Sequence, residues 1–152
     1  MSMYGSVSEA EEYFQTRYGA GAWDALANQP NETKDKIASL TTATHIIDRL
    51  NFKGCRTSTT QDLQFPRDGN TAVPIAIKLA TYEIALALLD GVEPEMEFEN
   101  LFLTSQGYAN VRSGHKDVPQ PHHLAGVPSF KAWTFLRPYM QDPNELKLDR
   151  VS

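Results

Sequence analysis

The stretch VPIAIKLATYEIALALLDG at positions 73–91 decides which kind of fold this chain adopts. Pro74 stands where a helix tolerates proline, at the first helical position, and Gly91 stands where glycine commonly follows a helix end. Between them the residues are apolar almost all the way round a helix. Such a helix is either the central helix of a bundle or one that also faces a partner subunit, and the pattern leaves both possibilities open.

A first helix is predicted near the N-terminus. Ser8 followed by Glu11 has the spacing of a capping box, in which two side chains satisfy the free amide groups at a helix start. Gly19 and Gly21 are expected to end this helix. The sequence AWDALA at 22–27 then predicts a short helical turn that packs against it.

A longer helix follows, with Asn31 as its expected N-cap and Gly54 as its stop signal. Its apolar face recurs at steps of three and four residues. The members of this face are Ile37, Leu40, Thr44, Ile47 and Leu50, flanked by Ala43 and Ile46. His45 lies in the middle of the helix, where we expect a partly buried, hydrogen-bonded side chain.

The C-terminal half has a different character, with an acidic stretch, a possible strand or hairpin and a sequence rich in proline and histidine. A short helix is predicted to begin at Pro128 and to stop before Pro138. We therefore predict a mainly α fold, a small bundle of three to five helices in one domain, residues 1–152. It comprises a helical core at about 6–91, a long irregular or hairpin segment at about 92–127, and a C-terminal helix with an extended arm at 128–152.

Composition excludes several classes of protein. The 152 residues carry a formal net charge of −5, which argues against non-specific binding to duplex DNA, because that binding relies on neutralising phosphates. No run of about 18 apolar residues predicts a membrane span, and the N-terminus lacks the features of a secretory signal. Cys55 is the single cysteine, so no internal disulfide is expected, and we interpret it as a bystander thiol.

The sequence contains no recognisable catalytic pattern. Neither a nucleotide-binding glycine loop nor a nucleophile elbow is present, and the carboxylate pairs lie in acidic runs that we expect to be solvated. A zinc site formed by His115 with Asp117, His122 and His123 is conceivable, but adjacent histidines project in different directions and the usual ligand spacing is missing. We therefore expect no enzyme activity, no metal site and no cofactor.

Two groups combine aromatic rings with a cation, as proteins that bind single-stranded nucleic acid do. They are Tyr13, Phe14, Arg17 and Tyr18 near the N-terminus, and Trp133, Phe135, Arg137 and Tyr139 near the C-terminus. At helical spacing such aromatic residues more often belong to a core or an interface.

The stretch QDLQFPRDG at 61–69 places an aromatic residue, a proline and an arginine inside an otherwise polar loop. Proline keeps Phe65 out of the helical conformation, so the chain is expected to enter the turn extended. Phe65 and Leu63 would then point toward the helices, while Arg67 would reach a carboxylate or the carbonyl groups at a helix end. We predict that Phe65, Pro66 and Arg67 form a packed hinge between two helices.

The order of these motifs resembles the small head–tail adaptor (connector) proteins of tailed bacteriophages. One branch of that family is often labelled DnaT-like single-stranded DNA-binding protein. The likeness spans roughly residues 6–91. It rests on SEAEEYFQTR, Trp23, KIASLTTATHIID, FKG, QDLQFPR and VPIAIKLATYEIALALLDG, in this order.

The resemblance implies a structural virion protein in the neck of a phage, assembled in the host cytoplasm. The expected partners are further copies of the chain in a twelvefold ring, the portal protein, and tail or nozzle proteins below. Genomic DNA would pass through the ring without sequence-specific binding. The alternative that the resemblance leaves open is a module that binds single-stranded DNA.

The resemblance also implies two contact surfaces. Neighbouring copies would meet through Ile77, Ile84 and Leu88 of the apolar helix, together with Tyr13 and Arg17. The C-terminal arm would dock onto the portal through Pro138, Tyr139, Leu146, Leu148 and Arg150.

Overall fold

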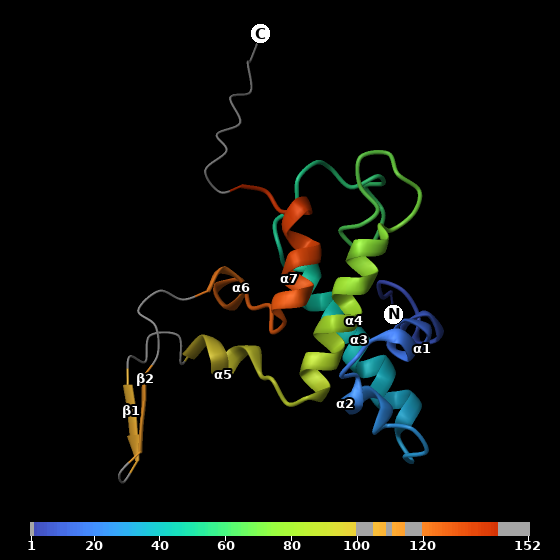
Figure 1. Ribbon diagram of the computed structural model, residues 1–152. Helices are drawn as coiled ribbons and strands as arrows, with labels where there is room; N and C mark the ends of the chain where they lie inside the picture. The colour runs from blue at the N-terminus through green and yellow to red at the C-terminus, as the bar shows by residue number, and fades with distance from the viewer. Residues whose placement is uncertain (1, 100–104, 109–110, 115–119, 143–152) are drawn as a thin grey trace.

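The computed structural model describes residues 2–99, 105–108, 111–114 and 120–142. Within these residues the fold is mainly α-helical, as predicted. The four substantial helices of this part of the chain are α1 (Val7–Thr16), α3 (Glu32–Asp48), α4 (Ile75–Leu89) and α7 (Phe130–Leu136). Helix α4 runs through the middle, with α3 crossing it and α7 alongside it (Figure 1).

Shorter elements connect these helices. They are α2 (Gly21–Asp24), α5 (Pro94–Glu99), the antiparallel strands β1 (Ser105–Tyr108) and β2 (Val111–Gly114), α6 (Pro121–Leu124) and the 3₁₀ turn η1 (Arg137–Tyr139). The segment expected to be irregular or a hairpin thus also contains two short helices, α5 and α6. The sequence did not predict them, because four to six residues are too few to establish a helical period.

Helix starts differ from the predictions by one or two residues. Ser6, not Ser8, caps α1, and its hydroxyl accepts a hydrogen bond from the Glu9 amide at 3.2 Å. The spacing Ser-x-x-Glu occurs twice in this stretch, so the pattern could not choose between the two. Pro74 is the N-cap of α4 and not its first helical residue, and Ser129, not Pro128, caps α7.

Helix α4 is enclosed mainly by its own chain, which favours the central-helix interpretation. Ile77 and Ile84 are completely buried against the rest of the bundle. The prediction that these two residues contact a neighbouring copy is therefore wrong, because a side chain without exposed surface cannot meet a partner. Leu88 is half-buried, and its assignment to an interface stays a prediction. Ile75, at the start of the helix, is 69% exposed.

The buried face of α3 matches the predicted one except at Ile37. Leu40, Thr44 and Ile47 are buried as expected, but Ile37 is 41% exposed. Lys36 takes a buried position on this face: its ammonium group contacts Glu11 at 2.9 Å and Glu32 at 2.6 Å. The interpretation of His45 as partly buried is wrong, since its side chain is exposed.

The corner at Phe65 is a packed hinge, as predicted, and its Phe65–Pro66 peptide bond is cis. The Phe65 ring is 4% exposed and makes edge contacts with Tyr4, Phe52 and Tyr139, at centroid distances of 6.1, 4.8 and 5.7 Å. These rings come from the N-terminal segment, the end of α3 and the C-terminal turn. The corner therefore joins parts of the chain that are far apart in sequence.

Tyr4 ties the N-terminal segment to this corner. Its hydroxyl donates to Asp48 at 2.5 Å and accepts the Phe65 amide at 3.2 Å. Burial, and then the hydrogen bond to the Asp48 carboxylate, raise the pKa of the Tyr4 phenol, so it stays protonated. No local pattern in the sequence predicts this contact, because Tyr4, Asp48 and Phe65 are far apart along the chain.

Arg67 reaches backbone carbonyl groups and no carboxylate. Its guanidinium donates to Lys53 at 2.8 Å, Gly54 at 2.6 Å and Phe52 at 3.3 Å, and also to the backbone and side chain of Gln64. Because the three carbonyls follow the end of α3, this corner clamps the loop that leads away from that helix.

The C-terminal turn belongs to the bundle and not to an arm. The Lys53 amide donates to the Tyr139 carbonyl at 2.9 Å, and the Gln141 amide donates to the Asn51 carbonyl at 3.0 Å. Pro138 and Tyr139 therefore do not start an extended arm, and their docking onto the portal stays a prediction. Leu146, Leu148 and Arg150 lie outside the described residues.

Replacing Arg67 by lysine should lower the free energy of unfolding by about 2–3 kcal/mol, because an ammonium group cannot satisfy several carbonyls at fixed positions. Urea denaturation measures the loss. The control is Arg56→Lys, since Arg56 is exposed and donates a single long hydrogen bond of 3.4 Å. Equal stability of the two variants would contradict the clamp.

Candidate nucleic-acid interface

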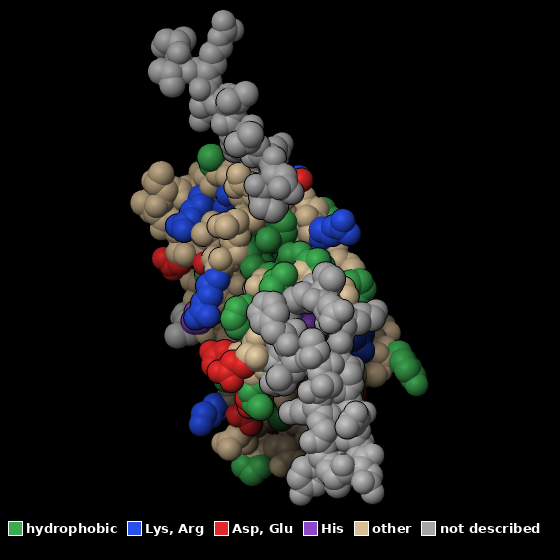
Figure 2. Space-filling view, turned by 90° about the vertical axis from the view of Figure 1, so that its left-hand side faces the viewer, with side chains coloured by type: hydrophobic (Ala, Val, Ile, Leu, Met, Phe, Trp, Pro, Cys, Tyr) green, Lys and Arg blue, Asp and Glu red, His purple; other side chains and the backbone are tan. Residues whose placement is uncertain are grey.

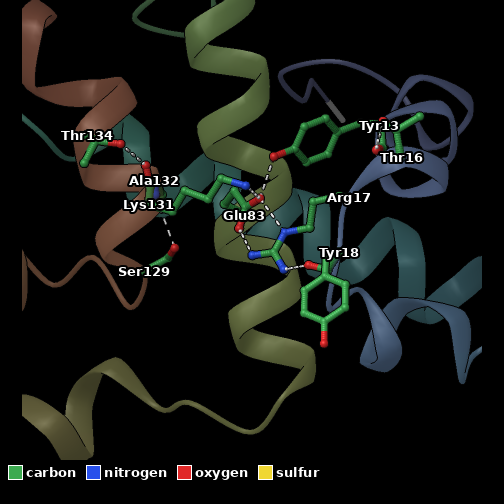
Figure 3. Close-up of polar contacts among 9 residues, drawn as sticks. All are labelled: Tyr13, Thr16, Arg17, Tyr18, Glu83, Ser129, Lys131, Ala132 and Thr134. Carbon is green, nitrogen blue, oxygen red and sulfur yellow. Dashed lines mark hydrogen bonds and ion pairs between the residues drawn. The ribbon is translucent and has the colours of Figure 1, made fainter.

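A buried carboxylate, that of Glu83 at the middle of α4, is contacted by two cationic side chains. Glu83 is 2% exposed and receives the Tyr13 hydroxyl at 2.6 Å. The Arg17 guanidinium donates two parallel hydrogen bonds to it, at 2.8 and 2.7 Å. The Lys131 ammonium lies 3.1 Å from the same carboxylate. Figure 3 shows these side chains converging from α1, α4 and α7.

Helix geometry explains why these residues meet. Tyr13 lies in the last turn of α1, and Arg17 is the C-cap residue directly after it, so both side chains leave the same end of the helix. Lys131 lies in the first turn of α7, which packs along the other side of α4. Glu83 stands where α4 passes between these two elements, so it can accept from both.

The partners keep Glu83 ionised. Burial alone would raise the pKa of the Glu83 carboxyl group, but hydrogen bonds from Arg17, Tyr13 and Lys131 outweigh burial and hold this pKa below its ordinary value. The bonds to Glu83 in turn raise the pKa of Arg17. With two cations and one anion, the cluster carries one net positive charge at neutral pH.

Two exposed aromatic residues are the sequence neighbours of these cations, and the Phe130 ring also packs edge-on against His122 of α6 at a centroid distance of 5.6 Å. Tyr18 follows Arg17 and is fully exposed, and Phe130 precedes Lys131 and is 63% exposed. The cations themselves are partly accessible, with 48% of the Lys131 side chain and 21% of the Arg17 side chain exposed. In Figure 3 the Tyr18 ring points away from Glu83, while its carbonyl accepts a hydrogen bond from Arg17. We call Arg17, Tyr18, Phe130 and Lys131 the aromatic–cation face.

The predicted aromatic–cation groups are thus only partly brought together. Of the N-terminal group, Arg17 and Tyr18 belong to the face, Tyr13 uses its hydroxyl on Glu83, and Phe14 is buried against Trp23 at 4.8 Å. The residues of the C-terminal group do not join it: Trp133, Phe135 and Tyr139 are half-buried, and Arg137 is exposed after the last turn of α7, whereas Lys131 reaches Glu83 from the first turn.

Sequence reasoning missed Glu83, Phe130 and Lys131. One signal was available for Glu83, since it is the lone acidic residue among the apolar residues of α4. A buried carboxylate needs a cationic or hydrogen-bonding partner, so its presence there implied that cations would come to it. Which cations would do so depended on how the helices pack.

The other predicted sites are placed apart from this face. Within the described residues no three His, Cys, Asp or Glu side chains come together as metal ligands. His122 is buried in α6 with its ring 4.1 Å from that of His123, and His115 lies outside the described residues. Cys55 is exposed.

Comparison with known proteins identifies the family. The family model described as "Putative DnaT-like ssDNA binding protein" matches residues 2–100. The chain belongs to this family. The match contains α1 to α5, with Tyr13, Arg17 and Glu83, whereas Lys131 of this DnaT-like chain lies beyond it.

The other two comparisons, with curated proteins and with solved structures, found no related protein. The family match carries no link to phage adaptors. Among the helices that the structure describes, none is both long and apolar enough to cross a bilayer.

Replacing Glu83 by glutamine should lower the free energy of unfolding at pH 7 by about 2–3 kcal/mol, because it leaves the cations without their buried anion. The folded-state pKa of Glu83 is lowered, so its stabilisation is present above the unfolded value of about 4.3 and is lost as pH falls through the folded value. Denaturation at several pH values should show the two proteins converging below about pH 4.

The matched control is Glu12→Gln, which removes an exposed carboxylate from α1. It should leave stability nearly unchanged at every pH. A stability difference for Glu83→Gln that persisted unchanged into acid would show that ionisation of Glu83 is not its cause.

Proposed function

We propose that this protein binds single-stranded DNA through the aromatic–cation face. The observation that carries the proposal is that Arg17 and Lys131 meet at one buried carboxylate, while the sequence neighbour of each, Tyr18 and Phe130, has an exposed ring. Membership of a family described by single-stranded DNA binding supports it.

The chemistry of the face suits an unpaired strand. Bases of any sequence can stack on exposed rings, and each stacked base contributes about 1–3 kcal/mol. The net positive charge of the cluster favours phosphate groups beside the rings. Duplex DNA hides its base faces, so the proposal predicts a preference for single strands with little dependence on sequence.

The charges also set how strong the binding is. Only two cations contact the proposed path of the strand, so the logarithm of affinity should fall with the logarithm of salt concentration with a slope of about −1.4. The overall charge of −5 opposes the approach of DNA. Binding is therefore expected to be modest and clearest at low ionic strength.

Binding of a labelled oligothymidylate, followed by fluorescence anisotropy at low salt, tests the proposal. Tyr18→Ala and Phe130→Ala should each weaken binding about tenfold through lost stacking, without destabilising the fold, because both rings are exposed. Lys131→Gln should weaken binding and reduce the salt slope by about 0.7, while Arg17 and Tyr13 still hold Glu83.

The control is Lys34→Gln, which removes an exposed lysine from α3. It should change affinity little. If the protein bound no oligonucleotide even at low salt, or if the three variants of the aromatic–cation face bound as the unchanged protein does, the proposal would be refuted.

A head–tail adaptor subunit is the second candidate. The overall charge of −5 favours it, because a channel wall that repels phosphate lets DNA slide past. The exposed Ile75 at the start of α4 offers apolar surface for a neighbouring copy. On this proposal the protein is a non-enzymatic virion component that forms a ring of twelve copies between the portal and the tail proteins.

Electron microscopy of the protein mixed with a portal ring distinguishes this candidate. A ring of copies seated on the portal would support it, and Ile75→Glu should prevent that ring from forming while leaving the fold intact. No density on the portal, with or without tail proteins, would exclude it.

A further inference from the structure

A groove separates α5 from the end of α3, away from the aromatic–cation face. Its volume is about 790 Å³, within the range of ligand-binding clefts. Ile46 of α3 and Leu88 of α4 contribute apolar surface at its base, and Leu124 at the end of α6 contributes more. Three stretches that are distant in sequence, 42–49, 88–99 and 124–126, therefore build one concave surface.

Two of the large apolar side chains that line the groove are not covered by the chain. Phe98 of α5 and Leu124 are each 52% exposed. Contiguous exposed apolar surface beside a cleft marks interaction sites in soluble proteins. Covering these side chains would remove them from water, which is the driving force for an apolar occupant.

The charges around the groove restrict what that occupant can be. Glu93, Glu95 and Glu99 line the side formed by α5, whereas Arg49 lines the side formed by α3. Figure 2, which faces this side of the molecule, shows acidic side chains next to hydrophobic ones. An occupant that fits needs a row of apolar groups with positive charge along one flank.

The same charges argue against a symmetric pair of copies. A two-fold contact through this groove would bring the carboxylates of two α5 helices together, and like charges across an interface are costly. The groove runs beside α3 from Thr42 to Arg49, about 10 Å or two helical turns. Two turns of helix are the length over which an amphipathic helix presents apolar anchors to a groove.

We propose that the groove between α3, α5 and α6 binds an amphipathic helix of a partner protein, with leucine-like anchors over Ile46, Leu88 and Leu124 and with lysine or arginine facing Glu93, Glu95 and Glu99. This surface is separate from the aromatic–cation face. The proposal holds whether or not the protein binds DNA.

Two alanine-based peptides of about 18 residues, long enough to be helical in water, serve as probes. Both carry leucine at positions i, i+3, i+4 and i+7, and one has lysine on the flank where the other has glutamate. Fluorescence anisotropy with the full-length protein should give at least tenfold tighter binding of the lysine peptide, because only that peptide matches the charge of α5.

Substitutions in the groove test whether the peptide binds there. Leu124→Ser and Phe98→Ala should each weaken the lysine peptide about tenfold, since each removes an exposed anchor contact. The combined change of Glu93, Glu95 and Glu99 to glutamine should abolish the preference between the two peptides. Ile75→Ser is the matched control, because Ile75 is also exposed but lies at the other end of α4, and it should change nothing.

Three results would overturn the proposal: equal affinity for the two peptides, no binding at a peptide concentration of about 1 mM, or equal effects of Leu124→Ser and Ile75→Ser. Light scattering, which measures the oligomeric state, provides an additional test. Self-association that Leu124→Ser abolishes would show that a second copy, and not a partner helix, occupies the groove. Oligonucleotide affinity should be the same in all groove variants, so failure here is distinguishable from failure of the DNA-binding proposal.

Discussion

The ionised carboxylate of Glu83 constrains the whole arrangement of helices. A charge that is 98% removed from solvent is tolerated only when cations and hydrogen-bond donors surround it. Here α1 supplies Arg17 and Tyr13 and α7 supplies Lys131, so the two helices are held against opposite sides of α4. The apolar contacts of α4 favour burial of this helix in general. The polar cluster at Glu83 determines that α1 and α7 are the elements that pack against it.

A second set of contacts, around Phe65 and Arg67, holds segments together at the end of the bundle, as Glu83 does at its middle. Phe65 packs among rings from the N-terminal segment, the end of α3 and the C-terminal turn. Arg67 satisfies the carbonyls of the loop that leaves α3. Because these partners come from both ends of the described chain, the corner closes the bundle rather than presenting a binding loop.

The requirements of stability and of the proposed function overlap at Arg17 and Lys131. Both cations hold the buried carboxylate, and both retain solvent-accessible surface beside an exposed ring. One carboxylate cannot neutralise two cations, so positive charge remains at the surface of an otherwise acidic protein. The groove at α5 has the opposite character, apolar with an excess of carboxylates, and suits a different kind of partner.

Local patterns in the sequence were enough to predict the helical class, the central apolar helix and the packed corner at Phe65. These features depend on residue periodicity and on the restrictions that proline imposes on its neighbours, which act within a few residues. The sequence misplaced Ile37 and His45 of α3, the start of the C-terminal arm and the exposure of Ile77 and Ile84, because burial depends on which helices cover a given face. The meeting of Arg17, Glu83 and Lys131 was decided by tertiary structure alone, since these residues are brought together across three helices that no local pattern relates.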